Sequence, residues 1–431
     1  MADKKIIEPI ILRGTRDFTP QQMIRRNAVM DTLRKVFEQF GYTPLETPIL
    51  SPAETILGKY GEEGDRLTYT FTDRGGRQIA LPYDLTVPFA RYFAANWREL
   101  PIPFKRYQIQ RVWRAERPQK GRLREFYQCD IDIIGSDDML CEVEIAKVIV
   151  VAFERLGIEN ITIKINSRPL LNDVLRSMNV SEEQTVPAIR IIDKLDKIGE
   201  DGVVAELKEA GIGNAKELIE ALKPAATNQE TMEKLAKYDT SQIQKFLELC
   251  RELDVPEEKF KFDPTLARGL DYYTGLIFEV VSADADFGTI CAGGRYDNLC
   301  GLFTEQSFSG MGVAFGFERI MLLLEEKGAF EGDTAISQVL VTRFDEDSTK
   351  DSLKLYNALI DAGIPAEVYL GSEKLGQQIK FADKKNIPAV VIIGPGEKAR
   401  GVITLKWLKS GEQQELTFDA LIAKLREADN A

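Results

Sequence analysis

Two strand-like runs joined by a charged loop stand out between Lys105 and Gly135, which read KRYQIQRVWRAERPQKGRLREFYQCDIDIIG. Side chains alternate across a strand, so the second run places Phe126, Gln128, Asp130 and Asp132 on one face. In an ordinary half-buried strand this polar face would meet water. The loop ERPQKGRLR argues for another role, because Lys and Arg gathered at the ends of two strands suit a polyanion.

The length and composition of the chain predict a multidomain globular protein. With 431 residues the chain is too long for one hydrophobic core, and we expect two or three domains. Hydrophobic residues make up 44% and charged residues 29%, which is typical of globular proteins. No apolar run reaches membrane-spanning length, and the start MADKKIIEPIILRG lacks a signal-peptide core. A cytoplasmic location is therefore expected.

Several classes of chemistry are excluded by residues that the chain lacks. There is no histidine, which removes Ser-His-Asp hydrolases and HExxH metalloproteases. The five cysteines include no C-x-x-C pair, so neither a disulfide framework nor a zinc site is indicated. The formal net charge of −12 disfavours loose binding to nucleic acid. Any RNA contact must come from local basic patches, and the chemistry should rest on fixed charges.

Before Lys105 the pattern predicts a helix, short strands and a second helix. Thr19, Pro20 and Gln22 form a capping-box start, and Gly41 ends the first helix. The prolines of TPLETPILSP suit an edge or an interface. Residues 66–74 and the start of RQIALPYDLTVPFARY read as strands, and residues 82–91 turn into a helix. Asp84 at that turn is most simply an N-cap carboxylate.

After Gly135 the sequence pattern changes three times. An amphipathic helix over residues 138–157 and the strand NITIKIN come first, and residues 169–253 then read as Lys- and Glu-rich helices. Two glycine-containing segments follow, DPTLARGLDYYTGLIF and CAGGRYDNLCGLF, which could form a hairpin with an aromatic plug. In GMGVAFGFER the spacing is not GxGxxG, so we reject a dinucleotide-binding fold. Arg319 there falls in the first turn of a helix, where a cation is disfavoured unless a phosphate binds.

The last hundred residues predict an α/β module with a mostly parallel sheet. Strands are expected at 338–343, 366–370, 389–393 and 402–407, and helices at 349–362, 373–386 and 417–427. GPGEKARG is interpreted as a surface turn, because it lacks the ending of a P-loop. Lys374, Lys380, Lys384 and Lys385 give one helix a basic face, which could equally be a solvated face.

Several of these segments together resemble the histidyl-tRNA synthetases, a family of class II aminoacyl-tRNA synthetases. Residues 19–52 are similar to motif 1, RAERPQKGR with REFYQCDIDIIG to motif 2, and GMGVAFGFER to motif 3. RGLDYYTG and AGGRYDNL resemble two segments typical of the family. The resemblance implies an α+β fold: an antiparallel-sheet catalytic core with a helical insertion, followed by an α/β anticodon-binding domain. The implied bounds are 1–168 and 255–328 for the core, 169–254 for the insertion and 335–431 for the last domain.

The resemblance also implies a reaction in two steps: histidine and ATP form histidyl-adenylate, and the histidyl group passes to tRNA(His). Mg²⁺ is expected on the outer phosphates, and no metal site made of protein ligands is expected. The implied partners are L-histidine, ATP, tRNA(His) and a second copy of the chain in a homodimer, with neither DNA nor a membrane. The absence of histidine is either compositional chance or, if the chain charges histidine as the resemblance implies, a way to escape shortage of that amino acid.

Site residues are implied at the positions that match the family's motifs. The catalytic set is Arg268, Arg114 and Arg319. The histidine site comprises Asp84, Thr86, Arg114, Gln128, Asp132, Arg268, Tyr272 and Tyr273. The ATP site comprises Arg114, Glu116, Arg122, Phe126 and Arg319. The tRNA contacts are Arg117, Gln119 and Lys120 at the acceptor end, and Lys374 and Lys380 in the last domain.

Two rival functions remain. A paralogue of the family keeps the catalytic fold, lacks aminoacylation and serves as a regulatory subunit in histidine biosynthesis. The intact segment from Arg268 to Gly275 and the presence of residues 335–431 speak against this reading. The second rival is a different class II synthetase, which RGLDYYTG and the absence of a zinc-ligand set disfavour.

Overall fold

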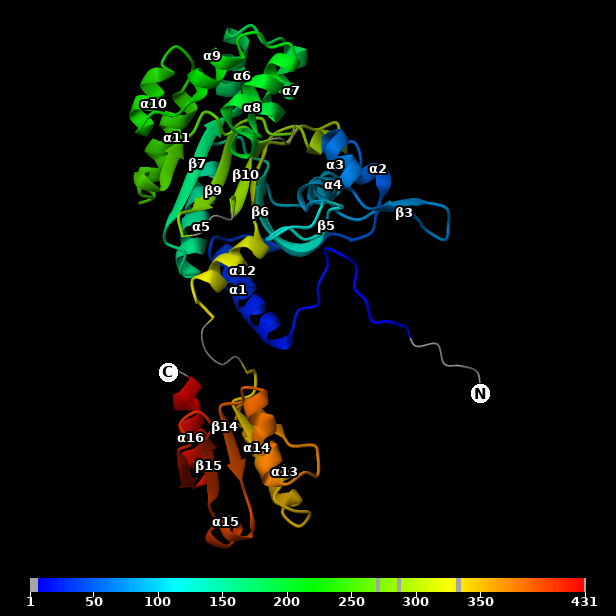
Figure 1. Ribbon diagram of the computed structural model, residues 1–431, viewed down its shortest axis with the longest axis vertical. Coiled ribbons are helices and arrows are strands. Elements are labelled where there is room, and N and C mark those ends of the chain that lie inside the picture. Colours follow the sequence, from blue (N-terminus) through cyan, green and yellow to red (C-terminus); the bar gives the residue numbers. More distant parts are fainter. Residues whose placement is uncertain (1–6, 269–271, 285–287, 331–334, 430–431) are drawn as a thin grey trace. The chain divides into compact units, whose positions relative to one another are not determined.

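The computed structural model describes residues 7–268, 272–284, 288–330 and 335–429. The chain divides into two compact units: one comprises residues 1–17 and 29–329, and the other comprises residues 18–28 and 330–431. Figure 1 shows the helices and strands of both. No helix in the described ranges has the length and apolar character that crossing a membrane requires.

An eight-stranded sheet, counted over the described residues, forms the centre of the first unit, in the order β1-β5-β6-β11-β10-β9-β7-β8. The pairs β1–β5 and β7–β8 are parallel, and the inner pairs are antiparallel. Its strands are β1 (Thr43–Pro44), β5 (Phe104–Trp113), β6 (Glu125–Ile134), β7 (Ile161–Ser167), β8 (Phe260–Phe262), β9 (Leu276–Ser282), β10 (Cys291–Tyr296) and β11 (Gly310–Phe315). The predicted antiparallel core is therefore confirmed, and the Pro44 strand lies at an edge.

Helices cover one face of this sheet. They include α1 (Pro20–Gln39), α5 (Leu140–Arg155) and α12 (Phe317–Glu326). The ring of Phe315 packs against Phe37 of α1 and Phe153 of α5, with ring centres 5.4 and 5.7 Å apart. The predicted capping box begins α1: the Thr19 backbone N–H donates to Gln22 Oε1 at 3.0 Å, and the Gln22 N–H donates to Thr19 Oγ1 at 3.3 Å.

A smaller layer lies beside β5. The three-stranded sheet has the order β2-β4-β3 among the described residues, with β2 (Ser51–Pro52), β3 (Thr70–Thr72) and β4 (Gln78–Ala80). Its helices are α2 (Ala53–Ile56), α3 (Gly61–Leu67) and α4 (Thr86–Asn96). The predicted strand over residues 66–74 was too long, because Arg66 and Leu67 end α3 and only three residues pair. A core of buried aliphatic and aromatic side chains, Phe89 and Phe93 among them, joins α4 to this layer.

The predicted helical segment is a group of short helices between β7 and β9. They are α6 (Arg168–Ser177), α7 (Glu182–Ile192), α8 (Leu195–Glu209), α9 (Ala215–Leu222), α10 (Asn228–Lys234) and α11 (Ser241–Glu252). Figure 1 shows them gathered at one end of the large sheet. Gly199 and Gly211 adopt positive φ, at 69° and 84°, so the backbone turns at both glycines.

The second unit contains a five-stranded sheet in the order β13-β12-β14-β15-β16 within the described residues. Its strands are β12 (Val339–Val341), β13 (Ala366–Val368), β14 (Ala389–Ile392), β15 (Ile403–Trp407) and β16 (Gln413–Leu416). Its helices are α13 (Thr349–Asp361), α14 (Leu375–Lys384), α15 (Pro395–Arg400) and α16 (Phe418–Asp429). Because β14–β15 and β15–β16 are antiparallel, the prediction of a mostly parallel sheet was wrong for half of it.

Two details of this unit correct the sequence interpretation. GPGEKARG is not a surface turn but contains the short helix α15, which Pro395 begins and Gly401 ends at a φ of 66°. The strand β16 was missed because its sequence QQEL is polar, with two exposed and two half-buried residues. The buried strands VLV and AVVI were found, because continuous apolar runs mark strands covered on both faces.

Candidate active site

A cavity of about 540 Å³ lies over the face of the large sheet formed by β6, β9, β10 and β11. This volume is within the ordinary range for small-molecule sites. Its lining includes every residue that the sequence implied for the histidine and ATP sites: Asp84, Thr86, Arg114, Glu116, Arg122, Phe126, Gln128, Asp132, Arg268, Tyr272, Tyr273 and Arg319. Residues 269–271 of the RGLDYYTG segment, Asp271 included, lie outside the described residues.

The polar face of β6 is buried rather than exposed to water. Gln128 is 8% exposed, and Asp130 and Asp132 are each 2% exposed. Glycines and alanines on the neighbouring strands leave room above this face. At Gly312 an added Cβ would overlap the carboxylate of Asp132, and at Gly293 it would overlap the backbone of Gly312. The close approach of these strands therefore requires glycine at both positions.

Arg114 lies where β5 ends, between two aromatic rings. Its Nε donates to the backbone carbonyl of Tyr83 at 3.0 Å. The guanidinium carbon lies 4.3 Å from the centre of the Tyr83 ring and 5.2 Å from that of Phe126. These contacts orient the guanidinium in the cavity. Among the described residues, no carboxylate lies at ion-pair distance from it. Its charge is therefore available to an anion.

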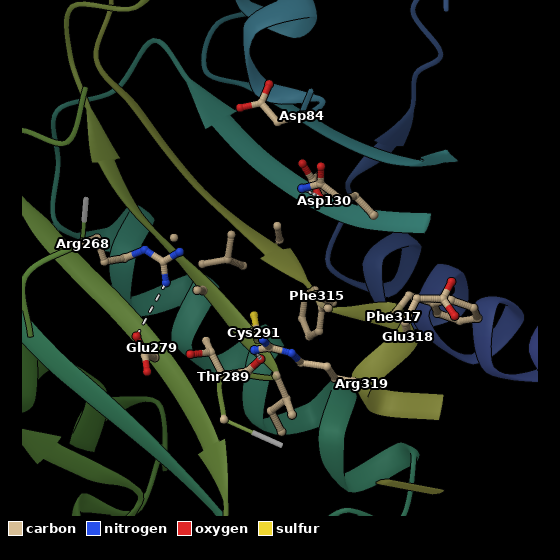
Figure 2. A pocket seen from close by; sticks show the side chains of 18 of the residues that line it. Asp84, Asp130, Arg268, Glu279, Thr289, Cys291, Phe315, Phe317, Glu318 and Arg319 are labelled. Atoms are coloured by element: carbon tan, nitrogen blue, oxygen red, sulfur yellow. Dashed lines mark hydrogen bonds and ion pairs between the residues drawn. The ribbon is translucent and has the colours of Figure 1, made fainter. Parts of the chain in front are cut away.

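Arg268 and Arg319 approach the cavity from two other segments. Arg268 Nη1 lies 3.8 Å from the carboxylate of Glu279 on β9. Arg319 follows the start of α12, and its Nη1 donates to the backbone carbonyl of Thr289 at 2.5 Å. Burial, with Arg122 nearby, lowers the pKa of Arg319. Figure 2 shows Arg268 and Arg319 in the same pocket, with Glu279 beside Arg268.

Arg122 belongs to the loop between β5 and β6 and pairs with Glu116 of the same loop, at 3.1 Å between Nη1 and Oε2. Gly121, in the same loop, has a φ of 71°. Its Cα faces the side chains of Leu322 and Arg319 on α12. The left-handed conformation at Gly121 turns the loop back over the start of α12. The loop thereby brings Arg122 and Glu116 to the lining of the cavity.

Asp84 is held at the start of α4. Its Oδ1 accepts hydrogen bonds from the Tyr60 hydroxyl at 2.8 Å and from the backbone N–H groups of Thr86 and Val87, both at 3.1 Å. The predicted N-cap position was wrong by one residue, because Leu85 is the N-cap of α4. The Asp84 carboxylate nevertheless accepts from the first two N–H groups of the helix. Burial raises the pKa of Asp84 above its ordinary value, although these donors and Arg114 oppose the rise.

Asp132 is held by two buried side chains that the sequence analysis did not consider. Arg106, on β5, is fully buried, and its Nη2 lies 2.7 Å from Asp132 Oδ2. The Tyr296 hydroxyl donates to Asp132 Oδ1 at 2.5 Å. Burial raises the pKa of Asp132, and Arg106 opposes that rise. Cross-strand pairing of Arg106 with Asp132 could have indicated the ion pair, but only once the register of β5 and β6 was known.

Tyr272 and Tyr273 form an aromatic wall of the cavity. Their ring centres lie 4.8 Å apart, and Tyr272 is 6.1 Å from Tyr296. Burial raises the pKa of both phenols, and for Tyr273 the nearby charge of Arg268 opposes the rise. The two phenols therefore stay protonated and can donate or accept hydrogen bonds inside the cavity.

The residues expected to contact tRNA are not in the cavity lining. Arg117, Gln119 and Lys120 lie in the loop between β5 and β6, where Lys120 pairs with Glu326 at 3.0 Å. Lys374 and Lys380 are exposed residues of the second unit, at the start of α14 and within it. Lining residues absent from the sequence-implied set include Asp130, Asp193, Glu279, Thr289 and Tyr296. Two of these had a signal in the sequence: Asp130 by its position on the polar face of β6, and Tyr296 by its place in the AGGRYDNL segment.

Comparison with known proteins gives this geometry a family. The family model described as histidyl-tRNA synthetase matches residues 14–320, and a model described as anticodon binding domain matches residues 338–428. The chain belongs to the histidyl-tRNA synthetase family. This membership confirms the resemblance that the motifs indicated.

Relatives and a solved structure agree with this assignment over nearly the whole chain. The histidine–tRNA ligase of Christiangramia forsetii is 40% identical, over 97% of this chain and 99% of the relative. That of Porphyromonas gingivalis is 41% identical, over 96% and 98%. The crystal structure of histidyl-tRNA synthetase from Nostoc sp. PCC 7120 is 31% identical and superposes with a TM-score of 0.85, covering 98% of this chain and 100% of the other.

The fold is also shared with a protein that is described with two functions. The structure from Bacillus halodurans described as an ATP phosphoribosyltransferase regulatory subunit/histidyl-tRNA synthetase has a TM-score of 0.72 and is 20% identical. It covers 88% of this chain and 97% of the other. At that identity the likeness concerns the fold alone, so it adds no support to the regulatory alternative.

Proposed function

We propose that this chain is a histidine–tRNA ligase of class II, which joins L-histidine to tRNA(His) through a histidyl-adenylate. The observation that carries the proposal is the convergence of Arg114, Arg268 and Arg319, from three separate segments, on one cavity. The same cavity contains buried carboxylates and phenols, which suit a small zwitterion with a polar side chain. Family membership supports the identity of the amino acid.

The first step joins the carboxylate of histidine to the α-phosphorus of ATP and releases pyrophosphate. The nucleophile is already an anion, so the site needs no general base. Its task is to align two anions and to stabilise the charge that develops on the phosphate oxygens. We assign this task to Arg114 and Arg268, with Arg319 at the triphosphate. In the second step the terminal ribose hydroxyl of the tRNA takes the histidyl group.

We assign the remaining lining residues by their position. Asp84, Thr86 and Gln128 hold the α-ammonium group of histidine. Asp132, Tyr272 and Tyr273 face its imidazole. Phe126 stacks on adenine, and Glu116 and Arg122 hold the adenine and the γ-phosphate.

Mg²⁺ would accompany the triphosphate, because it keeps several waters and is usually bound through substrate phosphates with one or two carboxylates. Glu116 and Glu279 are lining carboxylates that fit such an ion. The ion would neutralise part of the charge on the outer phosphates. The residues of this chain bind and orient both substrates around it.

We propose three functional parts, built from four segments of the chain: a catalytic core at 1–168 and 255–328, a helical insertion at 169–254, and an anticodon-binding domain at 335–431. Arg117, Gln119 and Lys120 would meet the acceptor end of the tRNA, and Lys374 and Lys380 its anticodon arm. The protein would act in the cytoplasm as a homodimer formed through residues 19–52, where Ile49 and Leu50 are exposed. Sedimentation equilibrium would test the dimer, and a monomer at micromolar concentration would contradict it.

ATP–pyrophosphate exchange with each amino acid in turn tests the proposed reaction. We expect exchange with histidine alone. An amino acid without the matching polar group would leave buried polar groups of the site unpaired, and the site would therefore reject it. Exchange with another amino acid would indicate a different synthetase. Binding of histidine without exchange would favour the regulatory subunit.

A further inference from the structure

A row of paired residues crosses the floor of the cavity. Asp130 on β6 pairs with Ala314 on β11, Ala314 with Ala292 on β10, and Ala292 with Glu279 on β9. All four side chains line the cavity. Neighbouring strands are about 4.8 Å apart, so three intervals separate the Cα atoms of the two carboxylates by about 14 Å. Two methyl groups cover the floor between them.

The carboxylates at the two ends of this row have different surroundings. Glu279 lies 3.8 Å from Arg268. Asp130 accepts, among the described residues, a single long hydrogen bond, from Gln128 Nε2 at 3.4 Å. Figure 2 shows Asp84 and Asp130 on one side of the pocket and the Arg268–Glu279 pair on another. The floor thus has an arginine at one end and two carboxylates near the other.

Asp130 also differs from the two carboxylates already assigned to histidine. Asp84 Oδ1 accepts from the Tyr60 hydroxyl and from two backbone N–H groups. Asp132 is held by Arg106 and Tyr296. Asp130 is as buried as Asp132, at 2% exposure, yet has no comparable donor within the described residues. A buried carboxylate in this position is costly unless a cation or strong donor joins it.

We propose that Asp130 binds the α-ammonium group of the amino-acid substrate, together with Asp84 and Gln128. This inference rests on the proposed function and adds a second carboxylate to the ammonium site. Gln128 and Asp130 are successive residues on the same face of β6, so one ammonium can lie between them. The carboxylate of the substrate would then point along the alanine floor toward Arg268. Burial raises the pKa of the Asp130 carboxyl, the charge of Arg106 opposes this rise, and a bound ammonium would oppose it further.

The test compares three ligands with the wild type and the Asp130→Asn variant. L-Histidine and L-histidinol both carry the ammonium and imidazole groups, whereas 3-(imidazol-4-yl)propionate lacks the ammonium. Affinities for the two analogues are measured as inhibition of histidine-dependent ATP–pyrophosphate exchange. We expect the substitution to lower the affinity for histidine and for histidinol about ten- to hundred-fold. Loss of one charge-assisted hydrogen bond has an effect of this size. Inhibition by the propionate should change less than about twofold.

Each other outcome has a definite meaning. Equal weakening of all three ligands would overturn the assignment to the ammonium, and unchanged affinity for all three would show that Asp130 makes no substrate contact. The urea midpoint of the Asp130→Asn variant should not fall, because the substitution removes a buried charge; a fall would indicate a structural role and overturn the proposal. Asp130→Ser, which also removes the charge, checks the result with a smaller side chain.

A matched control separates local from general effects. Asp137 is exposed just beyond the end of β6, and Asp137→Asn should leave all three affinities unchanged. If the wild type neither binds histidine nor supports exchange with it, the proposed function and this inference fail together. If the wild type does both and Asp130→Asn behaves like it, only the assignment of Asp130 fails.

Discussion

At the residue scale, the main finding is how the buried charges are partnered. Asp132 lies between Arg106 and Tyr296, and Arg106 Nε and Nη1 are buried without hydrogen-bond partners among the described residues. The ion pair therefore neutralises a guanidinium that sits 4.4 Å from the Phe89 ring. The Arg106–Asp132 ion pair therefore contributes both to the imidazole site, through Asp132, and to the core of the α4 layer, through Arg106.

Removing Asp132 should therefore affect stability as well as substrate binding. Asp132→Ala leaves the charge of Arg106 uncompensated, and breaking a buried pair in this way costs about 3–5 kcal/mol. The double variant Arg106→Met/Asp132→Ala should recover part of that stability, since no isolated charge remains. Urea unfolding measures both. A double variant no more stable than the single one would refute the charge argument.

The same pair of variants separates folding from recognition. In both variants the affinity for histidine should fall more than the affinity for ATP, because Asp132 is assigned to the imidazole site. Recovery of histidine affinity in the double variant would mean that Asp132 acts through the fold alone. Equal loss of histidine and ATP affinity would mean that the imidazole pocket has been misplaced.

Arg268 should contribute to the chemical step more than to amino-acid binding. Arg268→Ala removes a guanidinium assigned to the α-phosphate, so adenylate formation should fall by about 10²–10³-fold, as when one charge-stabilising donor is lost. Histidine affinity, measured by calorimetry, should change little. Near-normal exchange by this variant would remove Arg268 from the mechanism. Arg251→Ala, a substitution of an exposed arginine on α11, serves as the control.

At the element scale, close packing of β6, β10 and β11 shapes the cavity. Gly293 and Gly312 allow the strands to approach, and the row Asp130–Ala314–Ala292–Glu279 provides the floor. Small residues in the middle strands therefore serve the site as much as the charged ones at its ends. In the sequence these glycines and alanines have no chemical signal of their own.

Gly312→Ala tests this role of the strand. The added methyl would overlap the Asp132 carboxylate, and we expect overpacking to lower the free energy of unfolding by about 1–3 kcal/mol. Histidine-dependent exchange should be lost by a larger factor than stability explains, because Asp132 is displaced. Gly213→Ala is the control, since nothing lies within 4 Å of an added Cβ there. Equal activity in the two variants would contradict the argument.

Sequence patterns predicted the elements well where the signal was local. The capping box of α1, the strands β5 and β6, the helix whose first turn contains Arg319 and the apolar strands of the second unit were all predicted. The strand β16 and the helix α15 were missed, and the predicted parallel direction was wrong for two of the four strand pairs of the five-stranded sheet. A polar edge strand takes its structure from its neighbour, so its own residues carry little signal.

At the scale of the whole molecule, each unit has its own apolar core. That of the second unit comes from buried residues of β12, β14, β15, α13 and α16, with Val341, Leu359 and Leu405 among them. Lys374 and Lys380 lie on the surface of this unit, away from its core. Their proposed part in tRNA binding can therefore be tested without disturbing either core.

The variant Lys374→Ala/Lys380→Ala should weaken tRNA binding and leave ATP–pyrophosphate exchange unchanged. Each lost phosphate contact should lower the slope of log affinity against log salt by about 0.7–0.9. Lys385→Ala is the matched control, because Lys385 pairs with Glu367 at 2.6 Å. Filter binding over a salt series measures the slope. If the double variant keeps the slope of the wild type, these lysines do not contact phosphate.

The family, the order of the motifs and the residue types of the site could all be read from the linear chain, because each depends on a short local pattern. The partners of the buried charges could not. Arg106 meets Asp132, and Asp130 and Glu279 reach opposite ends of one row, through strand register, which depends on pairings between residues far apart in sequence. Burial of the polar face of β6 likewise depends on what the rest of the chain places above it. Folding thus turns an alternating strand into the floor of a charged cavity.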